Sequence, residues 1–296
     1  MMKFRQKAGL LLSAACLALA TTATAQSKFY VGAQIGYGIP ANSDVLGLKG
    51  NDNKLENSVG TIGGGLTAGI NLGYNITEYL SFDLGGQYLL GSQVTESDIT
   101  GPNGMHLKEE MKTNQFRLIP SLIIKTGEGK VKPLARFGLV IPVAGKTVRE
   151  HSSYDATPEA FHIPVPGTMA QQNYTYEFKG AVSLGFDAGL GIAYELSENI
   201  CMTAELNYTS LRIKTKSGTM TAYKADIDLG GTNIATLGMN DLPTLMKEIN
   251  FVDEINSNSN NRELGTNINR DQAEDQLARR TNFNSFGLKL GIKYGF

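Results

Sequence analysis

Tryptophan is absent from this 296-residue chain, and cysteine, histidine and proline are scarce, with two, three and nine residues respectively. An N-terminal segment that resembles an export signal contains Cys16, so the exported chain would keep only Cys201 and could not form an internal disulfide. No later stretch approaches the roughly 20 apolar residues that a membrane-spanning helix needs. Any membrane residence must therefore come from the patterning of its residues.

Neither sign of charge dominates the chain, which has 27 Lys and Arg against 28 Asp and Glu. Without the three cations of the N-terminal segment the balance is 24 against 28, a net charge of −4, and nothing indicates nucleic-acid binding. The three histidines, His106, His151 and His162, have no ligand-like spacing and no nearby cysteine, so we expect no metal and no cofactor.

The N-terminal segment has the three parts of a secretory signal. Cations occur within residues 3–7, an apolar run covers 8–20, and an A-x-A sequence occupies 23–25. The apolar run is too short to span a membrane as a helix. We therefore predict a cleaved signal peptide at 1–25 and a single exported domain at 26–296.

Period-two alternation of apolar and polar residues dominates the exported chain. Tilted strands of about 9 to 11 residues can cross the hydrocarbon layer of a membrane, and only a closed barrel leaves no unpaired backbone in lipid. A soluble β-sandwich is the alternative, since its strands alternate too. The eight apolar stripes cover 28–38, 66–74, 80–90, 116–124, 131–143, 178–194, 200–208 and 286–296.

Two features favour the barrel over the sandwich. Aromatic residues such as Tyr74, Tyr194 and Tyr294 stand near the ends of the stripes, where membrane interfaces hold amphipathic rings. Connections also alternate between short and long, as expected for periplasmic turns and extracellular loops. We predict an all-β fold, an antiparallel up-and-down transmembrane barrel of about eight strands with both termini facing the periplasm. The long loops are expected near 39–61, 92–112, 148–175 and 216–280.

The fourth long loop contains apolar residues at helical spacing, which predicts a short amphipathic helix. Its apolar face needs a cover, either as a lid packed on the barrel mouth or as a surface for a ligand or partner. The residues are Leu242, Leu245, Met246, Ile249, Val252 and Ile255.

The chain end carries a motif in which polar Lys289, Gly291 and Tyr294 precede a terminal Phe296. It resembles the C-terminal insertion signal of bacterial outer-membrane proteins. With the eight stripes, the chain is similar to the small OmpA-like and OmpX-like barrel families. This resemblance implies export to the outer membrane, assembly by the barrel-assembly machinery, and contact with outer-membrane lipid and lipopolysaccharide. Nothing follows Phe296, so we expect no peptidoglycan-binding domain.

Charged residues recur at inward positions of the stripes, within one layer near mid-barrel. An eight-stranded barrel is just wide enough to be filled by side chains, so a buried ionic plug is favoured over an ion pathway. The predicted interior charges are Asp83, Arg117, Arg136, Asp187, Glu205 and Lys289.

Three classes of function remain open at this level. A surface scaffold, whose loops meet an extracellular protein or a small-molecule ligand, is favoured by the mass of the loops. A narrow channel or transporter for small or hydrophobic solutes, axial or sideways through the wall, is the second. A rim enzyme is the third. Asp98 with His106 or Asp155 with His151 could in principle pair, but scattered loop histidines without a partner at a fixed spacing define no catalytic dyad, so we expect no enzyme.

Cleavage of the signal gives the first prediction. The exported protein should begin at Gln26, because small residues at Ala23 and Ala25 fit the signal peptidase site. Intact-mass measurement of protein purified from outer membranes tests it. The competing site is Cys16, preceded by Ser13-Ala14-Ala15, which resembles a lipoprotein cleavage box. A species that begins at a diacylated Cys16 would refute cleavage at Gln26.

Overall fold

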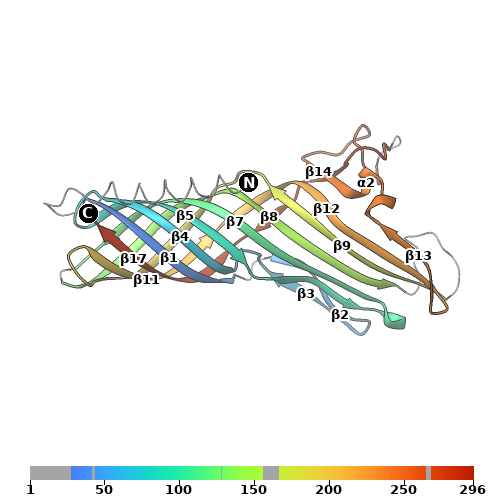
Figure 1. Cartoon of the computed structure of the whole chain (residues 1–296), viewed down its shortest axis with the longest axis horizontal. Helices are drawn as coiled ribbons and strands as arrows, with labels where there is room; N and C mark the ends of the chain where they lie inside the picture. The colour runs from blue at the N-terminus through green and yellow to red at the C-terminus, as the bar shows by residue number, and fades with distance from the viewer. Residues whose placement is uncertain (1–27, 42–43, 128, 156–166, 265–267) are drawn as a thin grey trace, which may run out of the picture.

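The computed structural model describes residues 28–41, 44–127, 129–155, 167–264 and 268–296. Along its longest axis, a β-barrel that contains the C-terminus continues into a curved sheet at the other end (Figure 1). Within the described ranges, no helix is long and apolar enough to cross a membrane.

Eight antiparallel strands form the barrel, as predicted. The ring closes because β1 pairs with β4 on one side and with β17 on the other, which leaves no free edge. The strands, in order around the ring, are β1 (Phe29–Pro40), β4 (Gly65–Asn75), β5 (Leu80–Gly91), β7 (His106–Lys125), β8 (Val131–Asp155), β10 (Gly185–Glu195), β11 (Ile200–Ser210) and β17 (Ser285–Gly295).

The closing strand β17 has opposite environments on its two faces. Leu288, Leu290 and Ile292 are 49–50% exposed, whereas Lys289 and Lys293 are only 5% and 6% exposed. Lysines inside and aliphatic residues outside reverse the arrangement of a water-soluble sheet. The same reversal on the other barrel strands makes the outside an apolar belt, which is the surface expected against lipid.

The two ends of the barrel differ in their connections. Short turns join β4 to β5, β7 to β8 and β10 to β11 at the end that holds the C-terminus (Figure 1). At the other end the strands run on, and β7 and β8 reach 20 and 25 residues. We call the sheet beyond the barrel at this end the outer wall. It adds β2 (Asp44–Asn51), β3 (Lys54–Gly60), β6 (Val94–Thr100), β9 (Thr168–Gly180), β12 (Arg212–Leu229), β13 (Thr232–Gly238), β14 (Glu248–Val252) and β15 (Glu274–Leu277) to the outer parts of β7 and β8.

The four long connections are therefore largely strands, which corrects the expectation of loops. Hairpin extension pairs their backbone groups with neighbouring strands instead of with water. The proline-rich part of the third connection, 156–166, lies outside the described residues.

The expected amphipathic helix of the fourth connection is also shorter than predicted. Among the described residues of this connection, only α2 (Thr244–Lys247) is α-helical, and a 3-10 turn η3 (Met239–Asp241) precedes it. From Glu248 the chain is a strand, because Ile249 pairs with Gly218 of β12. The apolar face is nevertheless covered: Leu242 packs with Met220 and Tyr223 on the inner face of β12.

One predicted strand is broken. The apolar stripe over 178–194 reads as continuous, but the structure ends β9 at Gly180, begins β10 at Gly185, and has no regular structure in between. The two halves pair with different partners. β9 lies between β8 and β12, and β10 lies between β8 and β11.

Closure by the last strand gives the second prediction. The backbone N–H of Phe296 donates a hydrogen bond of 3.1 Å to the carbonyl of Phe29, at the seam of the ring. Deletion of Phe296 should lower the folded fraction strongly, because the seam loses its last pairing and the resembled insertion signal loses its terminal aromatic. Tyr154→Ala, at the outer end of β8, serves as control. Heat-modifiable gel migration reports the folded fraction, and equal fractions for both variants would contradict this role.

Candidate functional site

A buried ion-pair group occupies the barrel interior around Arg136 of β8. Its Nε and Nη2 donate to the two carboxylate oxygens of Glu205 at 2.8 and 3.0 Å. Its Nη1 lies 3.5 Å from Asp83, whose carboxylate also accepts hydrogen bonds from the amide of Asn71. The fork geometry and the additional donor satisfy charges that would be costly alone in a narrow lumen.

A second group surrounds Asp187 of β10. Lys289 Nζ lies 2.9 and 3.0 Å from its two oxygens, and Asn207 and Thr209 donate to it at 2.9 and 2.7 Å. Arg117 stands apart from both groups: its Nε donates to Gln115 at 3.0 Å, and its Nη2 has no hydrogen-bond partner among the described residues.

All six residues identified from the sequence as interior charges lie inside the barrel, with exposures of 5% or less. Their partners could not be read from alternation alone. Sequence analysis also missed Lys293, which is 6% exposed and lies 3.9 Å from Asp83. The parity of β17, on which Lys293 shares a face with Lys289, was the signal that could have found it. Of the insertion-signal residues, Lys289 therefore faces the interior, whereas Tyr294 is 49% exposed on the outside.

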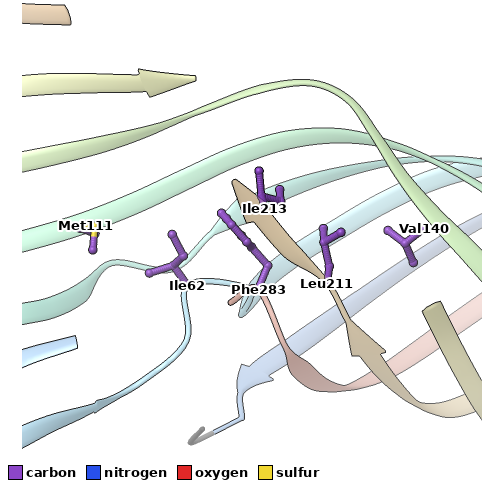
Figure 2. Close-up of a cluster of buried hydrophobic side chains, with 6 residues drawn as sticks. All are labelled: Ile62, Met111, Val140, Leu211, Ile213 and Phe283. Atoms are coloured by element: carbon purple, nitrogen blue, oxygen red, sulfur yellow. The ribbon is translucent and has the colours of Figure 1, made fainter. Parts of the chain in front are cut away.

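An apolar layer crosses the mouth of the barrel above the charges. Figure 2 shows the six side chains spread in a row, with Met111 at one end and Val140 at the other. Each is at most 8% exposed. Together with the charged groups, this layer contributes buried side chains to the interior of the barrel. The residues of this apolar layer are Ile62, Met111, Val140, Leu211, Ile213 and Phe283.

The side wall of the molecule is interrupted just above this layer. β8 pairs with β10 up to Val140 and with β9 only from Thr147. On the other side of the interruption is the irregular segment 181–184, in which Val182 and Leu184 are 81% and 70% exposed. We call this interruption, between 141–146 and 181–184, the lateral gap.

Local sequence explains the lateral gap. Pro142 has no N–H to donate, and Gly145 adopts φ +147°, a conformation that favours glycine. The register of β7 against β8 also shifts between Phe116 and Arg117, where β8 carries one extra residue, Val143. These features turn β8 away from β10 and toward β9.

A pocket of about 490 Å³ lies behind the lateral gap. Val143 and Val182 line it at the gap, and Ile62, Ile213 and Phe283 of the apolar layer line its base. This volume is in the range of small-molecule sites, and the lining is mixed, with apolar side chains such as Ile62 and Phe251 beside polar and charged residues. We call it the wall pocket.

Aromatic rings form one side of the wall pocket. Tyr174, Tyr176 and Phe178 follow one another on the inner face of β9, with adjacent ring centroids 5.7 Å apart. Burial raises the pKa of Tyr174 and Tyr176 to about 12, so both keep their hydroxyl protons. Phe251 of β14 extends the row, with its ring centroid 6.1 Å from that of Phe178.

Five basic side chains line the wall pocket with one acidic one. Arg149 pairs with Glu96 and stands over the ring of Phe178 at 5.2 Å. Arg262 makes two hydrogen bonds to Glu274; burial alone would raise the pKa of Glu274, but these bonds hold it below its ordinary value. The basic lining residues are Lys146, Arg149, Lys179, Arg262 and Arg279.

Two of the three histidines pair with carboxylates. His106 lies 3.1 Å from Asp98, as considered from the sequence, but His151 pairs with Glu109 at 3.1 Å and not with Asp155. The hydrogen bond from His151 lowers the pKa of Glu109. In the described ranges no three His, Cys, Asp or Glu residues gather in a way that could hold a metal ion. His162 lies outside the described residues.

A closed ring of eight antiparallel strands, with an apolar exterior and a charged interior, defines an outer-membrane β-barrel. The chain belongs to the family described as the outer membrane protein beta-barrel domain, whose model matches residues 8–238. This membership places it in the outer membrane.

Solved structures that are similar to the chain include the following two. The solution structure of outer membrane protein W from E. coli has 12% identity and a TM-score of 0.32, and covers 93% of this chain and 100% of its own. The translocator domain of the autotransporter NalP from Neisseria meningitidis has 10% identity and a TM-score of 0.27, with coverages of 99% and 96%. No curated protein matches the chain.

The ion-pair group gives the third prediction. Arg136→Ala leaves the buried carboxylates of Glu205 and Asp83 without their shared cation, so it should lower the free energy of unfolding by about 3 to 5 kcal/mol. The exposed Arg270→Ala should change it by about 0.5 kcal/mol or less. Urea unfolding in micelles measures both. Double-mutant cycles with Glu205→Ala and Asp83→Ala apportion the coupling. Unchanged stability of Arg136→Ala, combined with new ion conductance in planar bilayers, would contradict the plug.

Proposed function

We propose that this barrel binds small apolar or amphipathic solutes in the wall pocket and exchanges them with the outer leaflet through the lateral gap. The observation that carries the proposal is the position of the pocket. Its base is the apolar layer, and its side is the place where pairing between β8 and the next strand stops.

The filled lumen supports a sideways route over an axial one. A solute moving along the axis would have to displace the apolar layer and then the paired charges around Arg136 and Asp187. Separating those pairs in a narrow space costs several kcal/mol. The lateral gap requires no such rearrangement.

The composition of the lateral gap supports contact with lipid. Val143 and Val182 present exposed apolar surface on both sides of it. Unpaired backbone at membrane depth is tolerated where it lines a cavity, and the wall pocket supplies that cavity.

A surface scaffold is the second candidate, and the outer wall favours it. β8 continues to Asp155, so the outer wall extends well beyond the apolar belt of the barrel. There its strands would meet extracellular molecules. Interaction with lipopolysaccharide, and assembly by the insertion machinery, follow as proposals from the same placement. Solute binding separates the two candidates, because a pure scaffold needs no occupied pocket.

The absence of tryptophan makes a sharp test available. A single tryptophan at Phe251 would report on the wall pocket, and one at the 63% exposed Phe137 would report on the surrounding lipid. Titration of ω-bromododecanol into protein in lipid nanodiscs should quench Phe251→Trp saturably, because bromine quenches indole on contact. Phe137→Trp should be quenched only in proportion to the bromine content of the lipid.

A filled pocket should abolish the saturable phase. In the Phe251→Trp background, Thr215→Phe adds a ring to the lining and should weaken binding at least about tenfold, or about 1.4 kcal/mol. Thr219→Phe, on the exposed side of the same strand, is the matched control and should bind as the parent. Equal, non-saturable quenching at both reporters would leave the scaffold as the better function.

A further inference from the structure

We infer that the wall pocket selects amphiphiles with an anionic head, such as a carboxylate on a single alkyl chain, over neutral or cationic ones. The inference rests on the proposed solute binding and names the class of solute. The inference is based on the distribution of charge over the pocket. Apolar lining alone would bind anionic, neutral and cationic amphiphiles alike.

The basic side chains of the wall pocket are not all compensated. Arg149 pairs with Glu96, Arg262 with Glu274, and Lys146 with Glu177. Among the described residues, neither Lys179 nor Arg279 makes an ion pair or a side-chain hydrogen bond. Arg279 interacts with Glu96 electrostatically, without a direct contact. The lining therefore carries a surplus of two positive charges.

Position separates these two cations from the apolar base. Lys179 and Arg279 are exposed, whereas Ile62, Ile213 and Phe283 at the base are 1–7% exposed. Lys179 precedes Gly180 at the end of β9, and by alternation its side chain lies on the face opposite Phe178, on the outer side of the wall beside the lateral gap. A bound amphiphile would thus keep its head hydrated at the entrance and bury its tail against the apolar layer.

The same arrangement disfavours the opposite charge. An ammonium head at the entrance would meet Lys179 and Arg279, and the carboxylates nearby already have partners in Arg149, Arg262 and Lys146. Like charges in close proximity repel, while a carboxylate would gain two charge-assisted contacts. Selectivity therefore includes both attraction of the acid and repulsion of the amine.

Three solutes of equal chain length test this inference with the Phe251→Trp reporter in neutral-lipid nanodiscs. They are ω-bromododecanoic acid, ω-bromododecanol and ω-bromododecylamine, compared at a mildly alkaline pH at which the acid is ionised and the amine is still protonated. The acid should bind about threefold to tenfold more tightly than the alcohol, because two exposed cations each contribute modestly. The amine should bind more weakly than the alcohol.

A charge-matched pair of double variants assigns the effect to the two residues. Lys179→Gln with Arg279→Gln should remove the preference for the acid and leave the affinity for the alcohol unchanged. Lys112→Gln with Arg270→Gln removes the same net charge at exposed positions outside the pocket and should keep the preference. Added salt should reduce the preference of the parent, because exposed charges are screened, without altering alcohol binding.

The outcomes separate this inference from the proposed function. Saturable binding of acid and alcohol with equal affinity would overturn the anionic selectivity and leave solute binding standing. A preference that persists in the Lys179→Gln and Arg279→Gln variant would overturn the role of these residues. No saturable binding of any of the three would overturn both.

Discussion

Backbone hydrogen bonding in lipid is the constraint on which the whole structure depends. Within the hydrocarbon layer an unpaired N–H or C=O has no water to bind, so the sheet must close on itself. Closure falls to β17, which pairs with β1 and β11 along its full length. Where pairing between two neighbouring strands stops within the membrane, the unpaired backbone groups must therefore line a cavity. The lateral gap is such an interruption, and the wall pocket lies behind it.

Closure with eight strands also limits the width of the lumen, and the interior follows from that width. Arg136 and Asp187 each gather partners from several strands, so no charge in these two groups is left alone. The apolar layer adds six more buried side chains to the interior (Figure 2). Width thus explains why the charges inside the barrel occur in paired groups.

Much of the barrel was predictable because the face of each side chain is a local property. Successive residues of a strand point to opposite sides, so the exposed Leu290 and the buried Lys289 could be assigned from parity. The short turns and the terminal aromatic gave the direction of the strands. The fourth connection was misjudged, since Ile249 and Val252 at helical spacing lie in β14, where pairing with β12 overrides local preference.

The sequence by itself determined that this is a β-barrel, which residues face lipid, and that charges lie inside. Only the tertiary structure decided that Arg136 pairs with both Glu205 and Asp83. It also decided that the stripe over 178–194 forms two strands, β9 paired with β12 and β10 paired with β11. The physical reason is that alternation repeats every two residues along one strand, whereas register is set between strands far apart in the chain. Pro142 and the bulge beside Arg117 shift that register, so the wall pocket exists only once β7, β8, β9 and β10 have come together.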